Sequence, residues 1–142
     1  MVSFKNAIKN FYCKAFDFKS RATRAEYWWA ELYCIIIFLV LAGTVELVEH
    51  SNFLSGICLI TLLFHIIAKL SLFVRRVHDL GKSGWSILWM YLSCLIPIVG
   101  RIVSLLIFVN YTFSKGEKRD NEYGPNPYES GDIIIDSEEI KL

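Results

Sequence analysis

The sequence lacks the residue patterns that mark most metal proteins and nucleotide-binding enzymes. Its four cysteines are scattered with no C-x-x-C spacing, which argues against a zinc site or a disulfide framework. No second histidine or acid lies at ligand spacing from His78 and Asp79, so we expect no metal ion and no cofactor. Gly81-Lys82-Ser83 ends like a phosphate-binding loop, but Arg76 stands where that loop requires glycine, and the loop is therefore excluded.

Charged residues are rare in three long stretches of the chain, at 27–48, 53–74 and 85–113. The first two stretches are each 22 residues long, and about 20 apolar residues span the core of a bilayer. A helix of a soluble protein keeps a polar face, but residues 34–42 (CIIIFLVLA) have none. The sequence therefore predicts an all-α polytopic membrane protein with three to four transmembrane or re-entrant helices.

A secretory signal is also absent, because residues 1–26 are polar and basic and no cleavage site follows a short apolar run. We therefore expect the first apolar stretch to remain as a span. Apolar residues recur at helical spacing from Phe4 to Ala15, with three lysines mostly between them. This pattern predicts an amphipathic helix at residues 4–16 that lies on an anionic membrane surface. The alternative is a helix packed on the rest of the protein.

Lysine and arginine are distributed unequally among the segments that flank the spans. Residues 1–26 carry six basic and two acidic groups, and residues 75–84 carry three basic groups and one acidic group. Residues 49–52 contain no lysine or arginine. Because basic flanks stay on the cytoplasmic side, we expect the N-terminus and the 75–84 loop to be cytoplasmic, and 49–52 to form a tight outer turn.

The third apolar stretch is interrupted by Pro97 and Gly100. Proline removes a backbone donor and disfavours a helical residue before it. The stretch is therefore either one kinked span or two short helices, about 85–96 and 101–113, that turn at Pro97. Twelve residues rise only about 18 Å, less than the roughly 30 Å core, so the second arrangement would be a re-entrant hairpin. Basic residues just after the stretch favour this hairpin, with both termini cytoplasmic.

Three polar clusters lie at the boundaries of these stretches: residues 21–29 (RATRAEYWW), 75–85 (RRVHDLGKSGW) and 121–127 (NEYGPNP). In order and spacing they resemble the motifs of domain of unknown function 805, the YhaH-like family of bacterial inner-membrane proteins. The resemblance covers about residues 4–128 and implies one small polytopic membrane domain. It brings no catalytic residues, and the acidic segment 129–142 lies outside the family core and is expected to be a flexible tail.

Most side chains of these clusters are interpreted as structural. In the 75–84 loop, Asp79 would pair with an arginine and Trp85 would anchor the next helix. Thr23 and Glu26, three residues apart, fit a capping box that opens the first span. The residues assigned a motif or structural role are Arg21, Arg24, Glu26, Tyr27, Trp28, Asp79, Gly81, Ser83, Gly84, Trp85, Pro97, Gly100, Asn121, Tyr123, Gly124 and Pro125.

The competing interpretation of the loop is a binding site. Arg75, Arg76, His78 and Lys82 would together form a site for an anion or a lipid headgroup, because basic clusters on the cytoplasmic face attract anionic lipid. A weaker alternative is an enzyme that acts on headgroups with His78 and Asp79. The sequence favours a non-enzymatic membrane component that binds anionic lipid, a protein partner or a second copy of itself at its cytoplasmic face, with no nucleic-acid partner.

Glu31, His65 and Lys69 are ionisable residues that fall inside the predicted spans. An unpaired charge in lipid costs at least about 2.5 kcal/mol, so we predict a salt bridge between Glu31 and Lys69. His65 lies one helical turn from Lys69 on the same face. With Glu46 at the outer end, these groups would outline a polar path, so a small oligomeric transporter or channel is the alternative function.

Overall fold

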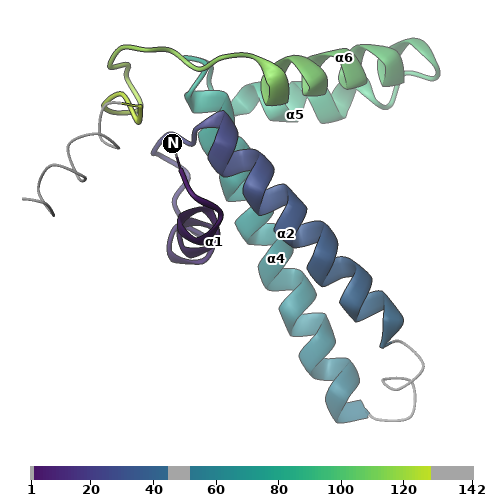
Figure 1. The fold of residues 1–142 in the computed structure, drawn as a ribbon. Coiled ribbons are helices and arrows are strands. Elements are labelled where there is room, and N and C mark those ends of the chain that lie inside the picture. Colours follow the sequence, from purple (N-terminus) through teal and green to yellow (C-terminus); the bar gives the residue numbers. More distant parts are fainter. Residues whose placement is uncertain (1, 45–51, 129–142) are drawn as a thin grey trace, which may run out of the picture.

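The chain folds into helices that meet at one end of the molecule (Figure 1). The computed structural model describes residues 2–44 and 52–128. Within these ranges the only strand-like pairing is an isolated bridge between Asn121 and Gly124. The helices are α1 (Phe4–Cys13), α2 (Arg24–Gly43), α4 (Asn52–His78), α5 (Trp85–Ser93) and α6 (Val99–Phe113). The fold is all-α, as predicted.

The two longest helices, α2 and α4, run side by side as an antiparallel pair (Figure 1). Both are long and apolar enough to cross a membrane, with mean hydropathies of 1.6 and 2.4. In the most apolar 18-residue segment of each helix, only 17% and 22% of the segment is buried inside the protein. A core helix of a soluble protein would be mostly covered. The outward side chains of this pair therefore need an apolar solvent, which a bilayer supplies. The predicted outer turn and Glu46 lie outside the described residues.

Helix α2 begins three residues before the predicted span because Thr23 caps it. The Thr23 hydroxyl accepts a hydrogen bond from the backbone N–H of Glu26 at 3.1 Å, which satisfies one of the free donors of the first turn. The predicted capping box is only half formed. Instead of returning to the cap, the Glu26 carboxylate pairs with Arg75 at 2.8 Å. Tertiary pairing with a buried guanidinium thus replaces the local contact.

Helix α1 lies against the sides of α2 and α4 (Figure 1). Ser3 caps it, and it ends at Cys13, three residues earlier than predicted. Ala7 and Phe11 are fully buried, so its apolar face is packed on the protein, which was the alternative considered for this segment. The hydroxyl of Ser71 in α4 lies 2.7 Å from the carbonyl oxygen of Asp17 and holds the segment after the helix.

The third apolar stretch forms two antiparallel helices, α5 and α6, and not one kinked helix (Figure 1). The turn between them includes Ile98, whose φ of 61° is a left-handed conformation that branched residues rarely adopt. Gly100 then allows a close approach, since a Cβ at this position would lie 1.8 Å from the Ser93 carbonyl oxygen. Helix α6 begins at Val99, two residues before its predicted start.

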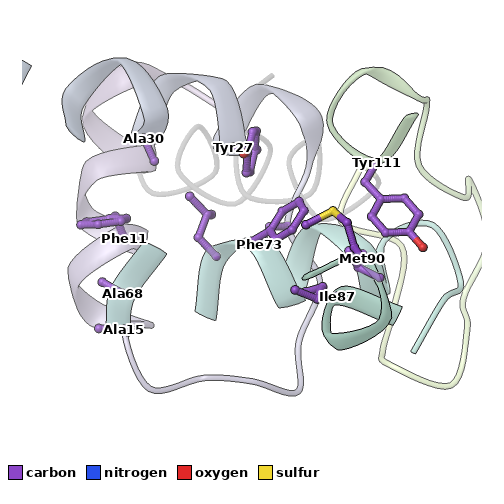
Figure 2. Packing of buried hydrophobic residues seen from close by; sticks show 12 residues of the cluster. Phe11, Ala15, Tyr27, Ala30, Ala68, Phe73, Ile87, Met90 and Tyr111 are labelled. Carbon is purple, nitrogen blue, oxygen red and sulfur yellow. The ribbon is translucent and has the colours of Figure 1, made fainter. Parts of the chain in front are cut away.

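The buried apolar core is small and lies where the helices converge. Figure 2 shows Phe11 and Ala15 from the N-terminal segment beside Ala68 of α4, and Tyr27 and Phe73 next to Ile87, Met90 and Tyr111. Away from this junction, α2, α4, α5 and α6 expose large aliphatic and aromatic side chains. The junction therefore fixes how the two helical hairpins are joined, and it is also where the polar motifs gather.

Candidate functional site

The three polar clusters of the sequence meet at the helix junction. Arg21 contacts Asp79 and also the carbonyl oxygen of Gly124 at 3.3 Å. The side-chain amide of Asn121 donates to the carbonyl oxygen of His78 at 3.0 Å. Segments separated by about a hundred residues thus form one polar assembly at the ends of α2, α4 and α6.

Asp79 is the centre of this assembly. Its Oδ1 accepts from Arg21 Nη2 at 3.1 Å and its Oδ2 from Arg76 Nη1 at 2.5 Å. The Tyr128 hydroxyl donates to the same Oδ2 at 3.2 Å. Burial raises the pKa of Asp79, and the two guanidinium groups oppose that shift. We call Arg21, Arg76, Asp79 and Tyr128 the arginine network; its three charged side chains are at most 2% exposed.

The two arginines of the network also bind backbone carbonyl groups. Arg76 donates to the carbonyl oxygens of Tyr111, at 3.1 Å, and of Ser114, at the C-terminal end of α6, where helix carbonyls have no partner within the helix. Arg21 donates to the carbonyl oxygen of Arg119 at 2.8 Å. The network therefore caps α6 and fixes the chain that follows it.

Arg75 belongs to a separate buried pair. It is fully buried, and its Nη1 lies 2.8 Å from Glu26 Oε1. Its backbone carbonyl oxygen accepts from the N–H of Ala22 at 3.0 Å. Within the described part of the chain, Arg75 Nε and Nη2 have no hydrogen-bond partner. This pair joins the start of α2 to the end of α4.

His78 and Asp79 point to different partners. The His78 ring stacks on Tyr123, with centroids 3.8 Å apart, and its Nδ1 lies 3.3 Å from the carbonyl oxygen of Ser20. Lys82 lies over the ring of Tyr111, 4.8 Å from its centroid. The structure therefore does not bring Arg75, Arg76, His78 and Lys82 together as one exposed cationic site, because both arginines are enclosed by protein groups.

Glycines permit the close contacts of the loop. Gly81 has a φ of 66°, which a left-handed turn after α4 requires. A Cβ at Gly116 would lie 1.8 Å from Asp79 Oδ2, so only glycine fits there. The sequence interpretation assigned no role to Gly116 and Tyr128; the available signals were a lone glycine in a charged segment and an aromatic residue directly after the third motif.

The other motif residues lie around this assembly in supporting positions. Ser83 accepts from the N–H of Trp85 at 3.4 Å, and Trp85 is 73% exposed, as suits an anchor at a membrane boundary. The N–H of Tyr123 donates to Asn121 Oδ1 at 3.0 Å, which closes the turn that contains Gly124. Pro125 is exposed.

Beside the arginine network lies a groove of about 650 Å³ that is rich in positive charge. Arg24 and Trp28 of α2 form one side of it. Lys115 and Lys118, which follow α6, form the other. All three cationic residues are exposed. We call this feature the basic groove; its lining is Arg24, Ala25, Trp28, Lys115, Gly116, Lys118, Asn126 and Tyr128.

The ionisable groups on the long helices have partners within the protein. The predicted salt bridge is present, with Lys69 Nζ 2.8 Å from Glu31 Oε1. His65 contacts Tyr12 of α1 through Nε2 at 3.3 Å and the carbonyl oxygen of Thr61 through Nδ1 at 2.8 Å. A smaller pocket of about 170 Å³ beside His65 and Lys69 is otherwise lined by Cys34 and aliphatic or aromatic side chains.

Comparison with known proteins agrees with the motif analysis. The profile of the family described as "Protein of unknown function (DUF805)" matches residues 15–125. The chain belongs to this family. The DUF805 match includes Arg21, Arg76, Asp79 and Gly116, and it ends three residues before Tyr128. The predicted family assignment is confirmed.

Two proteins of Escherichia coli (strain K12) are similar to this DUF805 chain over most of their length. Inner membrane protein YhaH is 32% identical over 127 residues, which cover 87% of this chain and 94% of YhaH. Inner membrane protein YhaI is 28% identical over 125 residues, which cover 87% and 93%. No solved structure matches the chain significantly. With its two candidate spans, the chain is an inner membrane protein of a family of unknown function.

Proposed function

We propose that this DUF805 protein is a non-enzymatic membrane component that holds an anionic phospholipid headgroup in the basic groove. The observation that carries the proposal is the convergence of Arg24, Lys115 and Lys118 on one recess. The groove lies at the end of α2 where the cationic flanks gather, which is the cytoplasmic side if basic flanks stay inside. The phosphate oxygens of a lipid headgroup at this end of α2 would reach the three cations directly.

The neighbours of the groove suit a lipid rather than a free anion. Trp28 is 37% exposed and its ring lies 4.8 Å from that of Phe113, so an aromatic wall continues from the groove toward the apolar surface of α2 and α6. Tryptophan favours the headgroup level of a bilayer. A phosphate in the groove would thus leave its acyl chains beside apolar helix surface.

One acid that adjoins the groove is already paired. Asp79 adjoins Gly116 and Tyr128 of the lining, but its carboxylate is neutralised by two buried arginines. Arg24 Nη1 donates to the carbonyl oxygen of Phe113 at 3.2 Å, which holds its guanidinium at the C-terminal end of α6. An anion would therefore meet three cations without competition from Asp79.

Transport, the alternative function, has weaker support. The groups it would use include Glu31, His65 and Lys69, and each of these contacts a neighbouring side chain. The pocket beside them is mainly apolar. A polar path for an ion would need these contacts to open, whereas the basic groove is open already.

The proposal is tested by the double variant Lys115→Ala/Lys118→Ala in lipid nanodiscs. Each basic residue near a membrane surface contributes about 1 kcal/mol of attraction to anionic lipid, so removing two should weaken retention by roughly 30-fold. Native mass spectrometry, after exchange into phosphatidylcholine with limiting phosphatidylglycerol, measures the fraction of protein that retains the anionic lipid.

The matched control is Lys5→Ala/Lys9→Ala, which removes the same charge from exposed positions of α1. Retention of phosphatidylglycerol should be close to wild type in this control. Equal retention in both double variants would contradict a headgroup site in the groove, because net charge alone would then account for lipid binding.

A further inference from the structure

The α5–α6 hairpin projects away from the α2–α4 pair and is held only at its base (Figure 1). Its buried residues include Ile87, Tyr111 and Thr112 near the base and Gly100 and Ser104 where the two helices touch. The rest of its surface is large and apolar. The most exposed side chains are Trp85, Trp89, Leu95, Ile98, Val99, Leu105 and Leu106, which are 61% to 76% exposed.

The hairpin turns several of its polar groups inward. Ser93 and Ser104 share a hydrogen bond of 2.5 Å between the two helices, and the Ser104 hydroxyl also lies 2.8 Å from the carbonyl oxygen of Met90. These contacts leave hydrocarbon on the outside of the hairpin. Such a surface is stable only against lipid or protein, and it continues the apolar surface of α2 and α4, which already faces the bilayer.

The hairpin is too short to cross the membrane. Helix α6 has 15 residues, a rise of about 22 Å at 1.5 Å per residue, whereas the hydrocarbon core is roughly 30 Å thick. Arg101 is the only charged residue between Trp85 and Phe113. It is exposed in the first turn of α6, and its charge is costly at the bilayer centre.

We propose that the α5–α6 hairpin is inserted in the cytoplasmic leaflet alone, with its outer surface in contact with lipid chains. In this position Arg101 extends along the hairpin to the headgroups of the same leaflet, as long cationic side chains do near an interface. The hairpin would displace lipid in one leaflet and not in the other. The proposal shares the orientation of the chain with the proposed function, but it does not depend on headgroup binding in the basic groove.

Depth measurements at the hairpin turn test this placement. The four cysteines are replaced by serine, and single cysteines are introduced by Leu95→Cys at the turn, Ile35→Cys on α2 and Glu122→Cys in the polar segment. Each protein is spin-labelled in nanodiscs, and collision rates with oxygen, which enters lipid, and with a water-soluble nickel chelate are compared. The Leu95 label should be shielded from nickel relative to Glu122 and should lie less deep than Ile35.

Three results would overturn the proposal. Nickel access at Leu95 equal to that at Glu122 would place the hairpin in water. Protection from both oxygen and nickel would place it under protein, such as a second copy of the chain. Reaction of Leu95→Cys in intact cells with a maleimide that cannot cross the inner membrane would show that the turn reaches the outer side.

The role of Arg101 has its own test in the same labelled protein. Arg101→Leu should move the Leu95 label deeper and raise its oxygen-to-nickel collision ratio, because the tether to the headgroups is lost. Asn110→Leu, at an exposed position near the base of the hairpin, is the control and should leave that ratio unchanged. An unchanged ratio in Arg101→Leu would contradict the depth-setting role of Arg101.

Discussion

At the scale of single residues, the polar core of this protein is ionic. Asp79 pairs with two arginines, and other donors of these arginines bind backbone carbonyl groups. A buried ion pair is stable only where each partner and its remaining hydrogen-bonding groups are satisfied. Arg21 and Arg76 come close to meeting that condition, which explains why they are enclosed although they lie near a membrane surface rich in attractive phosphates.

This arrangement makes Asp79 sensitive to loss of its charge. Asp79→Asn should lower the free energy of unfolding by about 3–5 kcal/mol, because two buried guanidinium groups would remain without a counterion. Thermal unfolding in a mild detergent, followed by tryptophan fluorescence, measures the change. Asp120→Asn is the control, because Asp120 is exposed and asparagine can still accept the hydrogen bond from the N–H of Asn126.

The control should change stability by no more than about 0.5 kcal/mol, as is usual for an exposed position. If Asp79→Asn unfolds with the same midpoint as Asp120→Asn, the arginine network does not stabilise the junction. Loss of stability in both variants to the same extent would point to net charge and not to buried pairing.

Some partners of these buried or membrane-facing charges could be predicted from the sequence, and others could not. The salt bridge of Glu31 and Lys69 could be predicted because both charges lie at similar depth on adjacent apolar helices, where few other partners exist. The full enclosure of Arg76 could not, because its partners besides Asp79 include the carbonyl oxygens of Tyr111 and Ser114. Every residue has a carbonyl group, so no pattern of residue types in the sequence predicts such a contact.

At the scale of elements, apolar length predicts the helices better than it predicts their ends. Helix α2 starts at Arg24 and α4 continues to His78, so both include polar residues that the apolar stretches leave out. These extensions exist because Thr23 caps one helix and the arginine network encloses the end of the other. Tertiary contacts at the junction, rather than local composition, set the boundaries.

The close packing of α5 against α6 depends on Gly100. Gly100→Ala should lower the free energy of unfolding by about 1–3 kcal/mol, because its Cβ would overlap the Ser93 carbonyl oxygen and force the helices apart. Gly56→Ala in α4 is the matched control, since a Cβ there meets nothing within 4 Å. It should be neutral or stabilise by up to about 1 kcal/mol, as alanine favours helix.

Unfolding of both variants under the same detergent conditions, followed by tryptophan fluorescence, measures this difference. If Gly100→Ala is as stable as Gly56→Ala, the close contact with Ser93 does not hold the hairpin together. A larger loss in Gly56→Ala would show that α4 packs through Gly56 against another chain.

At the scale of the whole molecule, the contacts of residues 117–124 determine on which side of the membrane this segment lies. Arg21 lies just before α2, and it donates to carbonyl oxygens of Glu117, Arg119 and Gly124. These segments must therefore share one side of the bilayer, and an even number of crossings must separate them. As the two candidate spans, helices α2 and α4 would supply two crossings, so the hairpin cannot add a single further crossing.

We therefore expect both termini to be cytoplasmic. Green fluorescent protein fused after Leu142 should be fluorescent, and alkaline phosphatase at the same position should be inactive, because the first folds in the cytoplasm and the second needs an oxidising compartment for its disulfides. The same two reporters fused after Gly43 of a truncated chain should give the opposite pair of results, since α2 alone crosses once. Active phosphatase after Leu142 would mean an odd number of crossings. In that case Arg21 could not contact residues 117–124 within one membrane-inserted molecule, and the junction itself would be contradicted.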